Sequence, residues 1–356
     1  MIDLPKKGMQ IKMEHVSSEK NEVGRPAGIS GSTLKIIAMV IMVIDHIGAV
    51  ILEPMLTQCG LKQAMASQEL QQQFLAQYGM LYMLDMVLRF IGRIAFPIFS
   101  FLLVEGFTHT RSRLKYGRNL FIFALVSEIP FDLATKGSFE DVKLIGGVIY
   151  PYSQNVFFTL FIGLLCMCGY EFAREHAEEY QKNVHATIFS WVIRLAGIAF
   201  PAVLIHSMLA RYYSGLSESL CWSVGLLAPI ALYAVVYLRT KNVTAYQLAC
   251  TDMTILALGG IMANLLHTDY SALGVLTITL IYLYRANRVK GIFAGCLALA
   301  IFNQMEITSF FAMIPVKKYN GERGLSMKYF FYAFYPVHLL LLYLIAACLQ
   351  FWEAVV

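Results

Sequence analysis

The stretch AMVIMVIDHIGAVIL, residues 38–52, decides the fold class of this protein. It is apolar throughout except for Asp45 and His46, and it belongs to a run long enough to cross a bilayer as a helix. A charged side chain at the centre of a bilayer costs roughly 2.5 to 3.5 kcal/mol on insertion scales, so such residues usually mark a packed bundle interior or a functional site. The stretch therefore predicts a membrane-spanning helix whose polar pair needs partners from other helices.

The composition extends this prediction to the whole chain. Of its 356 residues, 58% are hydrophobic and only 14% are charged. Apolar runs recur with a helical period rather than the alternation of an outer-membrane barrel, which predicts an all-α, polytopic membrane helix bundle. The net charge of +5 comes mostly from a tail and short loops and does not indicate nucleic-acid binding. The seven cysteines form no CxxC pair and no metal-type cluster, so no metal is expected.

The apolar runs predict about ten transmembrane helices. We place these spans at about 34–56, 86–108, 119–136, 154–170, 187–206, 220–238, 245–265, 271–284, 291–315 and 329–352. Residues 1–33 are polar and predict a disordered cytoplasmic tail. Residues 34–356 are expected to form a single transmembrane domain, and the Gln-rich stretch 57–85 predicts a helix on the outer surface.

Basic loops predict the orientation of the bundle. The loops 109–119, 238–242 and 285–290 are cationic and fall on the same side as the tail, which predicts a cytoplasmic N-terminus and, with ten spans, a cytoplasmic C-terminus. The basic loop 315–328 disobeys this count. Either a half-span around 304–316 returns the chain to the inner side, or the loop lies on the outer side and has a functional role there. We favour the second interpretation.

Four ionisable positions are predicted to share one depth. Counting 1.5 Å per residue from the cytoplasmic ends puts the Asp45–His46 pair about 17 Å deep, Arg93 about 22 Å, Asp132 about 18 Å and His338 about 20 Å. Two histidines at matched depth, one beside an acid, favour catalysis over simple packing. The sequence therefore predicts a polar layer in the outer half of the bundle.

Charge spacing suggests how this layer is paired. Glu128 and Asp132 lie four residues apart, so both cannot ionise without a cation, and Arg93 is the nearest candidate by depth. Arg93 also follows Asp85 and Arg89 at helical spacing, and the alternative is that these three form a purely structural ladder. Because neighbours on a helix point about 100° apart, Asp45 is poorly placed to orient His46, and Glu128 or Asp132 is the expected orienter.

Several polar motifs resemble the TraX family of conjugal-transfer membrane proteins. They are LKIIAMVIMVIDHIGAV (34–50), RIAFPIFSFLLVEGFTHTRSR (93–113), FALVSEIPFDLA (123–134), QNVFFTLFIGLL (154–165), DYSALGVLTI (269–278), YNGERG (319–324) and KYFFYAFYPVHLLLLYLI (328–345). The founder of that family acetylates the N-terminus of F-type pilin. TraX is in turn similar to wider membrane acyltransferases, which this chain resembles in His46 and in the stretch 96–106. Several relatives have an arginine about ten residues before that histidine, where this chain has Lys35.

The resemblance implies a bacterial cytoplasmic-membrane acetyltransferase with acetyl-CoA as the cytoplasmic donor. The acceptor would be an amine or hydroxyl on the far side: a pilin N-terminus, a surface glycan or a lipid. Acyl transfer needs a base and oxyanion donors, and we expect His46 to be the base. The remaining expected catalytic residues are Asp45, Arg93, Glu128, Asp132 and His338. The expected acceptor or oxyanion contacts are Gln154, Asn155 and Tyr335. The CoA phosphates would bind Arg111, Arg113, Lys115 and Arg118, unless these cations only set topology.

Two other functions remain open. In a proton-coupled transporter or flippase the same acids and histidines would relay protons, although no inverted repeat is visible in the sequence. In a non-catalytic partner of a conjugation or pilus apparatus, His46→Ala would spare function. Whether His46 acts as a base or takes the acyl group covalently is undecided by the sequence.

Overall fold

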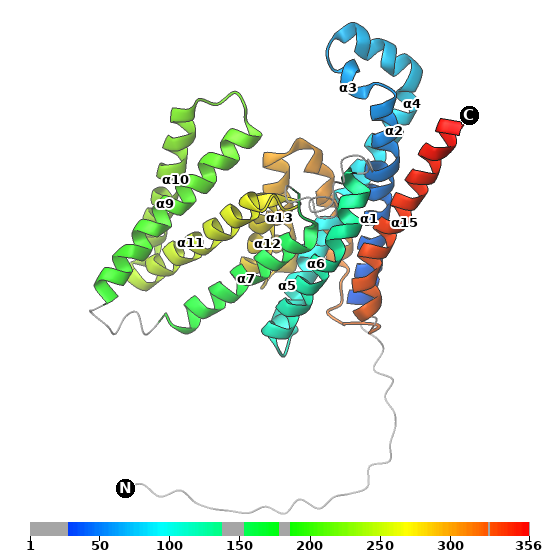
Figure 1. Ribbon diagram of the computed structural model, residues 1–356. Helices are drawn as coiled ribbons and strands as arrows, with labels where there is room; N and C mark the ends of the chain where they lie inside the picture. Colours follow the sequence, from blue (N-terminus) through cyan, green and yellow to red (C-terminus); the bar gives the residue numbers. More distant parts are fainter. Residues whose placement is uncertain (1–27, 137–152, 178–185, 327, 356) are drawn as a thin grey trace, which may run out of the picture.

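The chain folds as a helical bundle. The computed structural model describes residues 28–136, 153–177, 186–326 and 328–355, and within them the only extended backbone pairs are two isolated bridges, Ile29 with Tyr319 and Gln154 with Thr268. Figure 1 shows α1 and α15 on one side of the bundle and the pair α9 and α10 on the other, with α11, α7, α12 and α5 between them. The predicted tail falls, up to residue 27, outside the described residues.

The N-terminal half contains a long, interrupted helical hairpin. Its elements are α1 (Gly31–Ile47), a π-helical turn (Gly48–Leu52), α2 (Glu53–Gln58), α3 (Leu61–Ala64), α4 (Gln68–Gly92), α5 (Ala95–His109), α6 (Arg113–Lys136) and α7 (Val156–Glu175). The stretch 57–85 does not form a separate surface helix, because α4 runs without a break from Gln68 to Gly92. Figure 1 shows α2, α3 and the start of α4 projecting beyond the other helices.

The C-terminal half adds three long helices, a broken return and a final long helix. These are α9 (Ala186–Tyr212), α10 (Glu218–Thr240), α11 (Val243–Leu265), α12 (Ser271–Leu283), α13 (Arg288–Phe302), a 3₁₀ helix η2 (Gln304–Ala312), α14 (Met313–Lys317) and α15 (Lys328–Val355). Helix starts follow local capping chemistry, because Ser or Asn oxygens accept the first free backbone N–H groups. Such caps are Ser30, Ser67, Asn155, Ser217, Asn242, Asn287 and Asn303.

Seven helical stretches of the described chain are long and apolar enough to cross a membrane. They are Gly31–Gln58, Gln68–His109, Val156–Glu175, Trp191–Tyr212, Glu218–Thr240, Val243–Leu265 and Tyr329–Leu349. The protein is therefore a multi-pass, all-α membrane protein, but the predicted count of about ten spans is not confirmed. The predicted span 291–315 breaks at Asn303, and α12, with 13 residues, is short for a crossing.

The basic loop 315–328 is the clearest correction to the predicted topology. After α13, η2 and α14 turn the chain back, and the loop then pairs with the start of α1. Gly31 N donates to the Glu322 carbonyl at 2.7 Å, and Ser32 N donates to the Arg323 carbonyl at 3.0 Å. The half-span interpretation, which we did not favour, is the one that the structure supports.

The last helix lies parallel to the first. Lys35, near the start of α1, lies 5.0 Å from the ring centre of Phe331, near the start of α15, and His46 contacts His338 further along both helices. The far end of α15 is thus opposite to the start of α1 (Figure 1). This disagrees with the expectation that both termini face the cytoplasm, since the returning segment 304–317 changes the parity of the count.

Candidate functional site

Two histidines from the first and last helices meet inside the bundle. Nδ1 of His46 lies 2.7 Å from Nε2 of His338, and the two rings stack with their centroids 4.9 Å apart. These residues are 292 positions apart in the sequence. Their predicted depths agreed, and the structure places them in direct contact.

The hydrogen bonds around the pair fix the tautomer of both neutral rings. Nδ1 of His338 lies 2.8 Å from the carbonyl oxygen of Phe334, which can only accept. The proton of His338 therefore sits on Nδ1, its Nε2 accepts from Nδ1–H of His46, and Nε2 of His46 keeps its lone pair. No residue that the structure describes hydrogen-bonds to this Nε2. His338 therefore orients His46. The prediction that Glu128 or Asp132 does so is wrong.

Aromatic rings pack around the histidine pair. The Tyr335 ring lies 6.1 Å from the His46 ring and 5.6 Å from the His338 ring, edge-on to both, and Phe157 of α7 packs edge-on against Tyr335. His338 is buried and His46 is half-buried. The pair is therefore held in one geometry while part of His46 remains accessible.

A chain of charged groups lies next to the pair. Asp45 Oδ1 is 2.8 Å from Arg89 Nη1 and 3.8 Å from Arg93 Nη2, and Arg93 Nη1 is 3.5 Å from Oε1 of the buried Glu306 in η2. Arg89 and Arg93 also act electrostatically on His46. The arginines thus pair across helices, which does not fit the alternative of a structural ladder with Asp85 along one helix face.

One glycine allows this close approach of α1 to α4. A Cβ added to Gly92 would overlap the carboxylate of Asp45. Arg93 follows directly, at the junction where α4 ends and before α5 begins at Ala95. Pro97 therefore lies in the first turn of a new helix, where its missing N–H costs little.

Glu128 and Asn155 form a second buried contact, between α6 and α7. Oε2 of Glu128 accepts from the backbone N–H of Asn155 at 3.2 Å and from its side-chain amide. That amide also donates to the Ala124 carbonyl at 2.8 Å, while the Asn155 side-chain oxygen caps α7 at Phe157 N. The side chain of Asn155 therefore uses its hydrogen bonds to connect α6 with α7. Glu128 contacts Asn155 instead of Arg93, which was its predicted partner. Asp132 is buried on the same helix.

A loop with unusual backbone geometry borders the charged chain. His267, Tyr270 and Ser271 all have positive φ, at 50°, 62° and 44°, a conformation that costs energy for residues with a side chain. The predicted site residue Gln154 joins this loop through its backbone, accepting from Asp269 N at 2.8 Å and donating to the His267 carbonyl at 3.1 Å. Gln154 thus connects the start of α7 to the loop 267–271, and Asn155 connects it to α6.

Three residues near the site were not singled out from the sequence. Glu306, Asp269 and Tyr270 all act electrostatically on Arg93. Glu306 is the one acid of the apolar stretch 291–315, a signal that could have identified it. Asp269 and Tyr270 begin one of the family-like motifs and had no such local signal of their own.

The predicted phosphate-binding cations lie at the turn between α5 and α6. Arg111, Lys115 and Arg118 are exposed there. Arg113 instead faces two acids, at 3.6 Å from Glu171 and 3.9 Å from Glu175. Arg113 is therefore already paired with acids, whereas the other three cations are exposed.

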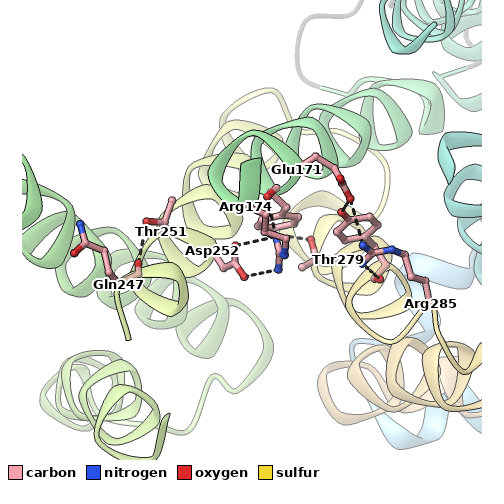
Figure 2. Close-up of polar contacts among 9 residues, drawn as sticks. Glu171, Arg174, Gln247, Thr251, Asp252, Thr279 and Arg285 are labelled. Atoms are coloured by element: carbon pink, nitrogen blue, oxygen red, sulfur yellow. Dashed lines mark hydrogen bonds and ion pairs between the residues drawn. The ribbon is translucent and has the colours of Figure 1, made fainter. Parts of the chain in front are cut away.

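A separate polar network joins α7, α11 and α12 (Figure 2). Arg174 binds Asp252 with both terminal nitrogens, at 2.9 and 3.4 Å, and its Nη1 also donates to the Tyr170 carbonyl. Beside it, Arg285 lies 3.3 Å from Glu171, which also accepts from the Tyr282 hydroxyl. This network pairs each charge and lies apart from the histidines. No cluster of His, Cys, Asp and Glu among the described residues is arranged to hold a metal ion.

Two comparisons with known proteins gave a match, one with a protein family and one with a single relative. A family model described as "TraX protein" matches residues 30–258 and 241–346. The chain is also 35% identical over 80 residues to the probable fimbrial assembly protein FimC, serogroup H1, of Dichelobacter nodosus, a match that covers 22% of this chain and about a third, 32%, of that relative. No solved structure matches the chain. With the family model covering the bundle from the first helix to the last, the chain belongs to the TraX family.

Proposed function

We propose that this protein is a membrane acetyltransferase that moves an acetyl group from acetyl-CoA to an acceptor amine or hydroxyl. The observation that supports this most directly is the histidine pair, in which His338 fixes His46 with the lone pair of Nε2 free. A neutral imidazole held in this way suits a general base. Membership in the TraX family and the fimbrial assembly relative favour an acceptor that belongs to a pilus or conjugation apparatus.

The transfer requires one base and one source of positive charge. The acceptor nitrogen or oxygen forms a bond to the acetyl carbonyl carbon while its proton moves to Nε2 of His46. The carbon–sulfur bond of the thioester then breaks, and coenzyme A leaves as the thiolate and takes up that proton. The oxyanion of the tetrahedral intermediate needs donors, and Arg93 offers a buried Nε–H without a partner among the described residues.

The other charged groups position this arginine. Asp45 and Glu306 hold the two ends of the Arg93 guanidinium, while Arg89 neutralises Asp45. In this proposal Tyr335 and Phe157 shape the wall beside His46. The exposed Arg111, Lys115 and Arg118 remain the proposed contacts for the phosphates of the donor.

The test is transfer of radiolabelled acetyl from acetyl-CoA to a short peptide with a free amino terminus. Purified protein in nanodiscs should label this peptide, and the same peptide with a blocked amino terminus should stay unlabelled. His46→Ala should lower the rate about 10²- to 10⁴-fold, the usual contribution of a general base.

The chain offers a matched control. His176 contacts the carbonyl four residues before it at 2.8 Å, as His338 does, but it lies at the exposed end of α7. His176→Gln should keep the wild-type rate. A transfer rate that His46→Ala leaves unchanged would refute the proposed role.

A further inference from the structure

Arg194 lies in the first third of α9 and has no carboxylate partner among the described residues. Its guanidinium lies between two aromatic rings, 5.2 Å from the ring centre of Trp191 and 5.3 Å from that of Tyr246 on α11. Its Nε is buried and has no hydrogen-bond partner among the described residues, and no acid there lies within ion-pair distance. Among the described residues, nothing compensates the charge of Arg194.

Two arginines of neighbouring membrane helices have the acid partner that Arg194 lacks. Arg174 is held by Asp252 across α7 and α11, in the network of Figure 2, and Arg89 is held by Asp45. Arg194 packs against the same α11, close to its start, and yet this helix supplies it with an aromatic ring instead of an acid. Since the described residues supply no counter-ion for Arg194, a ligand from outside the chain could supply one.

The position of Arg194 indicates where that counter-ion is. It lies eight residues after the start of α9, about 12 Å along the helix. In Figure 1, α9 begins at the same end of the bundle as the turn between α5 and α6. An arginine at this depth extends its side chain towards the headgroup region. Tryptophan and tyrosine are also enriched at that level of a bilayer.

The surface around Arg194 suits a lipid. Trp191 is 57% exposed, Val192 55% and Leu195 65%, and this apolar surface is large enough to face acyl chains. A guanidinium binds phosphate oxygens through two parallel hydrogen bonds, which neither aromatic ring provides. Both the charge and its apolar border thus match one amphipathic ligand.

We propose that Arg194, with Trp191 and Tyr246, binds the phosphate group of a membrane phospholipid whose acyl chains lie along α9. The phosphate neutralises the guanidinium, and the two rings enclose the headgroup contact. This site is independent of the histidine pair and of the proposed acetyl transfer.

The test is retention of phosphatidylglycerol by the full-length protein, measured by native mass spectrometry after transfer from nanodiscs to detergent. The wild type should retain one phospholipid. Arg194→Met should lower the retained fraction at least tenfold, whereas Arg194→Lys, which keeps the charge, should retain more lipid than Arg194→Met. As a control, Arg239→Met removes an exposed arginine from the last turn of α10 and should retain lipid like the wild type.

Two results would overturn the proposal. One is equal phospholipid retention by the wild type and by folded Arg194→Met. The other is a rise in the thermal unfolding midpoint with millimolar inorganic phosphate that equals the rise with phosphatidylglycerol, because the site would then bind free phosphate.

Discussion

Asn155→Ala is predicted to lower the stability of the bundle severely. Asn155 is fully buried and connects α6 to α7 by three side-chain hydrogen bonds, to Glu128, to the Ala124 carbonyl and from Phe157 N. Alanine removes all three without changing the backbone contact of residue 155 to Glu128, which is made by its own N–H at 3.2 Å.

The magnitude follows from these three contacts. Loss of the helix cap costs about 1 kcal/mol. Removing a donor from a buried carboxylate costs about 1.5–2 kcal/mol, at the low end because the backbone N–H remains, and the carbonyl contact adds roughly 0.5–1 kcal/mol. Together the free energy of unfolding should fall by about 3–4 kcal/mol.

The assay is unfolding of the purified protein in mixed micelles with increasing SDS, followed by circular dichroism. Asn242→Ala is the matched control, because Asn242 caps α11 at Thr244 N at 2.8 Å but is exposed and contacts no acid. It should lower the free energy of unfolding by only about 0.5–1 kcal/mol. Equal losses in the two variants would refute the anchoring role. A wild-type unfolding free energy with a large fall in acetyl transfer would instead make Asn155 an oxyanion donor.

Two further predictions concern the charged and polar interior. His338→Phe keeps an aromatic ring but removes the acceptor that fixes the tautomer of His46, so the rate of acetyl transfer should fall about 10- to 100-fold. The unfolding midpoint should fall only modestly, because the aromatic packing is kept while two hydrogen bonds are lost. A wild-type rate would contradict the tautomer argument. Arg174→Met leaves Asp252 without its cation and should lower the free energy of unfolding by about 2–4 kcal/mol, measured by the same SDS titration. The loss is smaller than for a fully buried pair because both side chains are partly exposed. A loss under about 0.5 kcal/mol would mean that Asp252 finds another partner.

The helices and the histidine pair were predictable because they depend on length and depth. Apolar runs of sufficient length gave the helices, and counting residues put His46 and His338 at similar depths. Depth does not determine which way a side chain faces, and here the prediction failed. Arg93 was the nearest cation by depth to Glu128 and Asp132, but it faces Asp45 and Glu306, on other helices.

Backbone contacts between distant segments were not predictable from residue patterns. Nothing local to Gln154 indicates that it pairs with the loop at Thr268, and nothing local to Ile29 indicates Tyr319. The break at Asn303 has a capping residue, but the apolar residues on both sides made the segment look like one continuous span. These features depend on partners far away in the sequence.

The contact between the first and last helices has a consequence for biogenesis. A ribosome delivers His46 to the membrane 292 residues before His338, so the pair cannot form until α15 has been synthesised. Until the final helix inserts, Asp45 and His46 must be tolerated by their earlier neighbours alone. A chain that lacks α15 would therefore keep Asp45 and His46 in the membrane without the partner that fixes the His46 ring.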